Sequence, residues 1–218
     1  MRRALIASLG AVAGALAFLL ALVGYRALAL QSVASLDDFG ALPAFALTDQ
    51  LERPVSSGDL QGKVVVADFI YTSCRDICPM LTARMRDLQE RLRRENLLVD
   101  RVQLLSFTVD PAIDSPAVLN AYAERFGADA SAWRFLTGPE QKLVPLIVDD
   151  FHLGREVLPP KPGEQQGNGA GISPNAAYEI LHGGRFVLID PQGRIRAYYD
   201  GREFDLEQVV RDIRKLLH

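Results

Sequence analysis

The sequence predicts an α/β fold in which helices cover a mixed central sheet, preceded by one N-terminal transmembrane helix. Three patterns support this prediction. Along most of the chain, short apolar runs typical of strands alternate with amphipathic runs typical of helices, which indicates βαβ units with parallel strands. Near the C-terminus, two strand patterns flank a Pro-Gln-Gly turn and predict an antiparallel hairpin. The third pattern is a long uncharged run at the N-terminus.

The uncharged run covers residues 4–24 and predicts a membrane anchor. A helix of this length measures roughly 30 Å, which is enough to cross a bilayer. A cleavable signal peptide is the alternative, because Ala27-Leu28-Ala29 resembles a small-residue cleavage site. We favour an uncleaved anchor, since the run is longer than the apolar core of a typical signal peptide. The charges of Arg2 and Arg3 indicate that residues 1–3 stay in the cytoplasm.

The rest of the chain predicts a tether at residues 25–40 and a single domain at residues 41–218. This organisation fits a single-pass protein of the bacterial inner membrane whose C-terminal domain lies in the periplasm. The formal net charge of −3 argues against nucleic acid as a partner.

The strand patterns follow one another along the predicted domain. Strands are expected at residues 45–48, 64–71, 102–109, 133–136, 185–190 and 194–199. A helix pattern separates the runs at 64–71 and 102–109. We therefore expect these two strands to pair in parallel through a right-handed crossover.

Helices are expected after Pro79, from Ser115 to about Phe126, at residues 140–151 and at residues 205–217. Pro79 suits the first turn of a helix, and Ser115 suits an N-cap. Pro145 should bend or shorten the helix that contains it. Residues 154–175 are rich in Gly and Pro, so they predict a long exposed loop.

The chain has only two cysteines, Cys74 and Cys78, and they lie where the strand at 64–71 turns into the next helix. Backbone N–H groups and the helix dipole at such a turn favour thiolates. Two neighbouring thiolates can bind a soft metal ion or close a disulfide. We therefore interpret the pair as a redox or metal-binding site.

Three other interpretations of the cysteines compete with this one. An inert structural disulfide would close so short a loop that it restricts the unfolded chain little. Two unrelated buried thiols would produce the Cys-x-x-x-Cys spacing at this turn only by coincidence. Half of a zinc site would need a second cysteine pair, which the sequence lacks.

His182 is the candidate for a third ligand among the histidines His152, His182 and His218. It stands between the predicted long loop and the strand at 185–190, where site residues often collect. A lone loop histidine with no functional role fits the same position equally well. His152 follows an apolar helix pattern, so we expect an ordinary packed or exposed residue there. We expect His218 to complement the dipole at a helix C-terminus.

Several short segments stand in a characteristic order along residues 43–218. The segments are Phe45-Ala46-Leu47-Thr48-Asp49-Gln50, Asp59-Leu60-Gln61-Gly62-Lys63, Thr72-Ser73-Cys74-Arg75-Asp76-Ile77-Cys78-Pro79, Ser106-Phe107-Thr108-Val109-Asp110-Pro111 with Asp114-Ser115-Pro116, Trp133-Arg134-Phe135-Leu136-Thr137-Gly138, and His182 with Phe186-Val187-Leu188-Ile189-Asp190. In this series the chain resembles the Sco/SenC family of membrane-anchored copper proteins with a thioredoxin-like fold.

The resemblance implies that Cys74, Cys78 and His182 bind one copper ion, as Cu(I) or, with a further ligand, as Cu(II). It also implies a role at the binuclear copper centre of cytochrome c oxidase, either delivery of copper or reduction of the centre's cysteines beforehand. The expected partners are the copper-bearing oxidase subunit and a periplasmic copper donor or thiol reductant.

The chain departs from the family pattern at three places. Arg75 follows the first cysteine where the family usually has proline, and a cation there would lower the pKa of Cys74 further. Leu181 precedes the histidine where the family commonly has aspartate, which removes a carboxylate that could orient the imidazole. Gly183 and Gly184 replace bulkier or hydroxyl residues, so we expect them to loosen His182.

The competing class is an enzyme, a thiol–disulfide oxidoreductase in which Cys74 attacks and Cys78 resolves. Three residues separate the cysteines instead of the usual two, which favours a metal carrier that is not an enzyme. A peroxiredoxin-like peroxidase is a weaker alternative. For Asp110 and Asp114 we favour turn and helix-start chemistry over a direct role at the site. For Met80 we favour packing beside the turn over a place as a soft neighbour of the metal.

Overall fold

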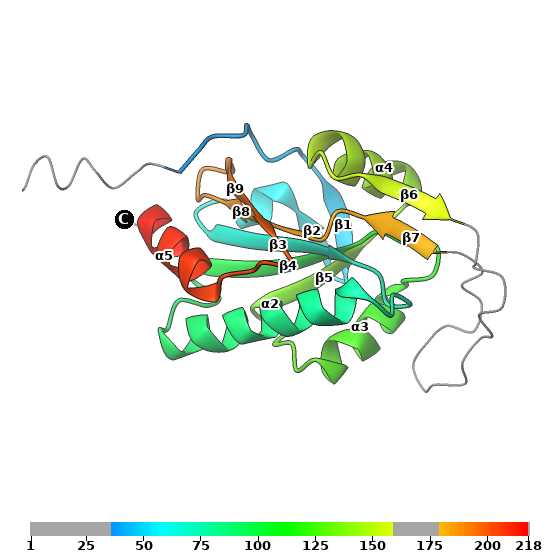
Figure 1. Cartoon of the computed structure of the whole chain (residues 1–218), viewed down its shortest axis with the longest axis horizontal. Coiled ribbons are helices and arrows are strands. Elements are labelled where there is room, and N and C mark those ends of the chain that lie inside the picture. The colour runs from blue at the N-terminus through cyan, green and yellow to red at the C-terminus, as the bar shows by residue number, and fades with distance from the viewer. Residues whose placement is uncertain (1–35, 159–178, 218) are drawn as a thin grey trace, which may run out of the picture. The chain divides into compact units, whose positions relative to one another are not determined.

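The computed structural model of the protein describes residues 36–158 and 179–217. The chain from Asp37 to His218 forms one compact unit. Its main element is a seven-stranded sheet with the strand order β2-β1-β5-β4-β3-β8-β9 (Figure 1). The strands are β1 (Ala46–Asp49), β2 (Pro54–Ser56), β3 (Val64–Ile70), β4 (Val102–Thr108), β5 (Trp133–Thr137), β8 (Arg185–Ile189) and β9 (Ile195–Asp200).

The centre of the sheet is parallel, and both of its sides are antiparallel. Strand β4 pairs in parallel with β3 and with β5. Strand β8 runs antiparallel to β3, and β1 runs antiparallel to β5. Every residue of β3 and β4 is buried, as expected for central strands covered by helices on both faces. The predicted mixed sheet and its C-terminal hairpin are therefore confirmed.

Helices cover both faces of this sheet (Figure 1). The helices are α2 (Ile77–Arg94), α3 (Pro116–Arg125), α4 (Glu140–Pro145) and α5 (Leu206–Leu216), with a 3₁₀ turn η1 (Ser57–Leu60) and a π-helical turn η2 (Leu146–Asp150). One face carries α2, whose apolar stripe of Leu81, Met85, Leu88 and Leu92 is fully buried. The other face carries η2, after which Phe151 packs against Phe69 and Phe107.

Several element boundaries differ from the sequence-based expectation. Helix α2 begins at Ile77, before Pro79, so Cys78 lies inside the helix. The helix expected at 140–151 is split after Pro145 into α4 and η2, because proline cannot donate the hydrogen bond that would continue the α-helix.

The described residues also form a separate two-stranded sheet. It consists of β6 (Arg155–Leu158) and β7 (Glu179–His182), which pair antiparallel. The loop expected at 154–175 is therefore wrong for residues 155–158, which form β6. Residues 159–175 of that expected loop lie outside the described residues.

The predicted membrane anchor at residues 4–24 also lies outside the described part of the chain, as do residues 25–35 of the tether. Within residues 36–158 and 179–217, no helix combines the length and hydropathy needed to span a bilayer.

Candidate functional site

The two cysteines lie at the point where β3 ends and α2 begins. Cys74 is half-buried in the turn, where its backbone N–H donates to the Tyr71 carbonyl oxygen at 3.2 Å. Cys78 is fully buried in the first turn of α2, and its backbone N–H donates to the Cys74 sulfur at 3.5 Å. Both thiols are free. The predicted juxtaposition of the two sulfurs on a strand-to-helix turn is therefore present, with Cys78 in the helix rather than before it.

Hydrogen-bond donors around Cys74 stabilise its thiolate. They lower the pKa of Cys74 to about 6, and the largest contribution is a hydrogen bond from the Cys78 side chain. The backbone N–H groups of Cys78 and Asp76 and the side chain of Tyr71 add to it, against the opposing effect of partial burial. At neutral pH Cys74 is therefore mostly a thiolate. Arg75, which was expected to contribute, is exposed.

Cys78 behaves in the opposite way. Burial raises the pKa of Cys78 far above its usual range, and the hydrogen bond to Cys74 and the negative charge of Cys74 raise it further. The pair therefore holds one proton on Cys78 and presents one negative sulfur, Cys74, at the surface. Such a pair can donate a thiolate to a soft metal or attack a disulfide.

A buried carboxyl group, Asp68, lies in β3, the strand that leads to the cysteine turn, and sequence reasoning missed it. Its Oδ1 accepts a hydrogen bond from the Ser106 hydroxyl at 2.5 Å, and its Oδ2 has no hydrogen-bond partner among the described residues. Burial raises the pKa of Asp68 to about 7, and its charge contributes to the raised pKa of Cys78. An aspartate inside the apolar run at 64–71 was the signal that could have identified it.

The hydroxyl groups behind Cys78 form a second buried polar contact. Thr82 donates from its hydroxyl to the Cys78 carbonyl oxygen at 2.9 Å, and its oxygen lies 2.9 Å from the Tyr122 hydroxyl. These contacts join the first turn of α2 to α3. They hold the buried side of the cysteine pair in place while Cys74 remains open to solvent on the other side.

His182 is the last residue of β7, where its backbone pairs with Arg155 of β6. It was expected in a loop, but it ends a strand. Its side chain lies outside the part of the structure that is described. Among the side chains that are described, no three His, Cys, Asp or Glu residues come together as a metal site.

The backbone that follows His182 packs directly against the cysteine turn. A Cβ atom added to Gly184 would lie 2.4 Å from Cδ1 of Ile77, the residue between Asp76 and Cys78. A Cβ atom added to Gly183 would lie 3.5 Å from the Leu153 side chain, an ordinary contact distance. Gly184 therefore allows the chain two residues after His182 to approach α2 closely. The loosening expected for His182 concerns a side chain outside the described part of the structure and stays a prediction.

The other candidate residues have no described role at this site. His152 is exposed directly after η2, with a left-handed φ of 54°. Met80 is half-buried in the first turn of α2. His218 lies outside the described residues.

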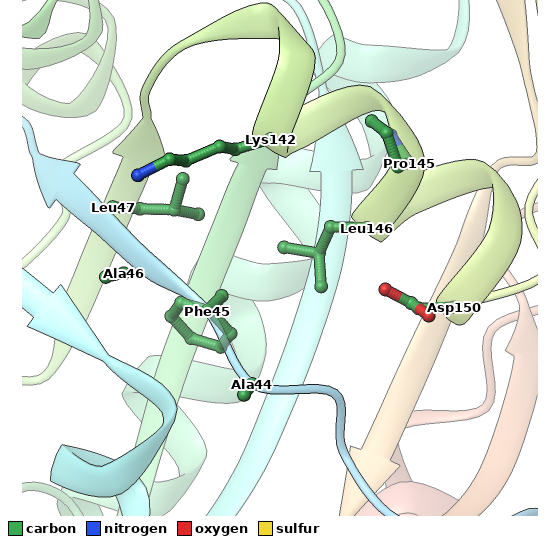
Figure 2. A pocket seen from close by; sticks show the side chains of 8 residues that line it. All are labelled: Ala44, Phe45, Ala46, Leu47, Lys142, Pro145, Leu146 and Asp150. Atoms are coloured by element: carbon green, nitrogen blue, oxygen red, sulfur yellow. The ribbon is translucent and has the colours of Figure 1, made fainter.

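A cavity of about 490 Å³ lies away from the cysteines, between β1 and the helical turns α4 and η2 (Figure 2). Phe45, Leu47 and Leu146 point into it, and Lys142 and Asp150 lie at its edge. Neither Cys74 nor Cys78 is among the described residues that line this cavity, so the cysteine pair has no part in it.

The chain is similar in sequence to known proteins. A family model described as SCO1/SenC matches residues 35–218. The "SCO1 protein homolog" of Bacillus subtilis (strain 168) is 32% identical over 173 residues, which cover 78% of this chain and 79% of that protein. A "Putative copper-binding protein" of Stutzerimonas stutzeri is 30% identical over 176 residues, which cover 78% of this chain and 77% of that protein.

A solved structure has the same fold. BsSco, described as a member of the Sco family of cytochrome c oxidase assembly proteins, superposes with a TM-score of 0.65 at 29% identity. The alignment covers 84% of this chain and 98% of that structure. The mixed sheet and its covering helices are thus shared between the two proteins.

Proposed function

Because the chain belongs to the SCO1/SenC family, we propose that it is a copper-binding metallochaperone that delivers copper to the binuclear copper centre of cytochrome c oxidase. Two relatives support this proposal through the copper binding named for one and the oxidase assembly named for the other. The observation that carries it is the cysteine pair itself, in which a half-buried thiolate contacts a second thiol at a strand-to-helix turn.

The proposed ligands are the sulfurs of Cys74 and Cys78 and the imidazole of His182. Two sulfurs and one nitrogen form a low-coordinate, soft donor set that suits Cu(I). Cys74 supplies a ready thiolate, whereas Cys78 must release its proton when copper binds, so binding strengthens as the pH rises. The close packing of Gly184 on Ile77 supports the inclusion of His182, because it brings the end of β7 to the cysteine turn.

Delivery requires that the ion can also leave. Cys74 lies half-exposed while Cys78 is fully buried, so a partner's cysteine pair would reach the copper from the Cys74 side. Handover would then proceed by stepwise replacement of these ligands by the partner's thiolates.

Competition titration with a Cu(I) chelator tests the ligand set. The reduced full chain should bind one Cu(I), and His182→Ala should weaken binding by at least tenfold, since one of three ligands is lost. His152→Ala is the matched control, because it removes another histidine, one that is exposed shortly before β6. It should leave the affinity unchanged. Failure of the wild-type chain to bind copper in either oxidation state would contradict the proposal.

A thiol–disulfide reductase is the second candidate, and the unequal protonation of the two cysteines favours it. The Cys74 thiolate would attack one sulfur of a partner disulfide, forming a mixed disulfide and releasing a partner thiolate. Cys78 would then lose its proton and attack Cys74, closing the intramolecular disulfide and releasing the second partner thiolate. A thiol reductant must reopen it. BsSco, for which a disulfide switch is described, gives this candidate a precedent.

The two candidates respond differently to the same variant. His182→Ala should remove most copper affinity but leave the rate of exchange with a model disulfide within about twofold, because the imidazole takes no part in that step. If His182→Ala instead lost thiol exchange and kept its copper affinity, the reductase would be favoured, and His182 would not be a copper ligand.

We also propose that residues 4–24 anchor the chain in the bacterial inner membrane, with the domain in the periplasm. The uncharged run and the preceding Arg2 and Arg3 support this orientation. Alkaline phosphatase fused after His218 should be active in cells. An inactive fusion, or release of the chain from washed membranes, would contradict the proposal.

A further inference from the structure

The carboxylate of Asp114 lies directly behind the cysteine turn. It is fully buried at the end of the segment that leaves β4. Its two oxygens accept hydrogen bonds from the Thr72 hydroxyl, from the Thr72 backbone N–H at 3.1 Å and from the Thr108 hydroxyl at 2.5 Å. A single carboxylate thus joins the chain beyond β3 to the end of β4.

Asp114 is itself held in place by its own segment. Its backbone N–H donates to the Asp110 carbonyl oxygen at 2.9 Å, and the Asp110 N–H donates to the Thr108 hydroxyl at 3.0 Å. Val109 adds a hydrogen bond to the Ile70 carbonyl oxygen at 2.8 Å. The loop after β4 is therefore held by hydrogen bonds of its own, and the end of β3 is bonded to it.

The expected role of Asp114 in starting the next helix does not match these contacts. Ser115 is the N-cap of α3, and its hydroxyl accepts the Val118 N–H at 3.4 Å. The hydrogen bonds described for the Asp114 carboxylate go to Thr72 and Thr108, not to α3. Burial of a carboxylate costs free energy, and hydrogen bonds from Thr72 and Thr108, not from α3, offset that cost here.

Thr72 connects Asp114 to the cysteine turn, because it stands two residues before Cys74. Strand β3 ends at Ile70, so the chain from Tyr71 to Cys74 has left the sheet and its ladder of hydrogen bonds. Asp114 binds both the backbone N–H and the hydroxyl of Thr72 and so fixes the direction in which the turn leaves β3. The Cys74 sulfur depends on that direction to meet the Cys78 N–H.

We propose that Asp114 is a positioning residue, which ties Thr72 to the end of β4 and thereby holds the Cys74 sulfur against the first turn of α2. As a role in copper handling, this inference rests on the proposed function. The geometric part concerns Cys74 alone and applies equally to metal binding and to thiol exchange.

The test compares three variants of the reduced full chain. Asp114→Ala removes all the tying hydrogen bonds, and Asp114→Asn keeps one carbonyl acceptor for Thr72. Ser115→Ala is the matched control, because it removes the N-cap hydroxyl of α3, and so lowers stability, without touching Thr72. Each variant is measured for unfolding by denaturant, for the pH profile of Cys74 alkylation and for Cu(I) affinity.

The proposal predicts a specific pattern. Asp114→Ala should move the midpoint of the alkylation profile upward by at least one pH unit and weaken Cu(I) binding by tenfold or more. Asp114→Asn should fall between it and the wild type, whereas Ser115→Ala should lose stability with an unchanged profile and affinity. If Asp114→Ala does not fold, Thr72→Val removes only the hydroxyl contact and should show a smaller shift in the same direction.

Unchanged alkylation and copper affinity in folded Asp114 and Thr72 variants would overturn the proposal and leave a purely structural role. The outcome is separable from the proposed function. If the wild-type chain binds no copper but Asp114→Ala still shifts the alkylation profile, the positioning role stands and the metallochaperone proposal fails.

Discussion

The two cysteines differ in protonation: the sulfur of Cys74 is charged and that of Cys78 is neutral. The Cys78 thiol above all, then the backbone N–H groups at the start of α2 and the Tyr71 side chain, stabilise charge on Cys74, while burial keeps the proton on Cys78. Because the two sulfurs share a hydrogen bond, a change at one alters the pKa of the other. The asymmetry is thus a property of the pair.

Removal of the Cys78 thiol tests this coupling. Cys78→Ala should raise the pKa of Cys74 above its value of about 6, since the Cys78 side chain makes the largest contribution to the lowering. Cys78→Ser keeps a hydroxyl donor at the same place and should raise it less. The pH dependence of the iodoacetamide reaction rate measures both, and equal midpoints for the two variants would contradict the assignment.

Asp68 should make folding stability depend on pH. In the folded chain burial raises the pKa of Asp68 to about 7, from 3.8 for the free group. The folded state therefore keeps a proton that the unfolded state releases, and stability falls as the pH rises from about 4 to about 7. The isosteric variant Asp68→Asn removes this dependence.

Denaturant titrations at both ends of that range measure the effect. Between pH 4 and pH 7 the wild-type chain should lose roughly 2–4 kcal/mol more than Asp68→Asn, at about 1.4 kcal/mol per unit of pKa shift. Parallel pH profiles for the two chains would show that Asp68 ionises normally in the folded state.

At the level of elements, two glycines decide how closely the C-terminal hairpin approaches α2. A Cβ atom added to Gly201 would lie 2.4 Å from the Gly184 carbonyl oxygen and 2.2 Å from the Leu81 side chain. The Gly201 N–H donates to that same Gly184 oxygen at 2.7 Å. The ends of β8 and β9 are thus joined to each other and packed on the first turns of α2.

Gly201→Ala should therefore destabilise the fold by about 2–3 kcal/mol, because a backbone oxygen cannot move aside as a side chain can. Gly183→Ala is the matched control, since its Cβ atom would lie at an ordinary 3.5 Å from Leu153. Equilibrium unfolding compares the two. Equal losses for both variants would contradict the close approach.

The same elements show what the sequence could predict. Strands β3 and β4 were predicted from their continuous apolar runs, and α3 from its Ser-Pro start, because these signals are local. The edge strand β2 was missed because it has only three residues, and β6 was missed because it stands at the start of the Gly- and Pro-rich stretch that predicted a loop. The start of α2 at Ile77 was missed because the sequence places a proline, Pro79, two residues later and suggests a later start.

The site was predictable to the extent that it is local. The spacing of the two cysteines identified the pair, and the resemblance to a family added His182. The tie between Thr72 and Asp114 spans 42 positions of sequence, and only the parallel pairing of β3 with β4 brings the two residues together. No local pattern reports such a contact, which is why Asp114 was expected to serve its own turn.

In the unit from Asp37 to His218, the strand order brings the proposed site together where the central strands β3 and β4 end. Parallel strands β3 and β4 end there together, and β7 leads into β8, the neighbour of β3. The cysteine turn, the Asp114 support and the end of β7 thus come from three separate stretches of sequence. A ligand that bound Cys74, Cys78 and His182 would join these stretches.

Copper should consequently stabilise the whole unit. At a free Cu(I) concentration 1,000 times the dissociation constant, the free energy of unfolding should rise by up to about 4 kcal/mol. His182→Ala should reduce this gain, and His152→Ala should retain it. Chelator-buffered thermal unfolding measures the effect. A gain that is the same for all three chains would indicate that the histidine does not hold the ion.

The most direct test of the account is X-ray absorption spectroscopy of the Cu(I)-loaded full chain, which reports the atoms bound to copper. We expect two sulfur ligands and one imidazole nitrogen in the wild-type chain, with the nitrogen lost in His182→Ala and retained in His152→Ala. Copper bound by sulfur alone in the wild-type chain, or no stoichiometric copper at all, would contradict the central claim that the cysteine turn and the end of β7 form one copper site.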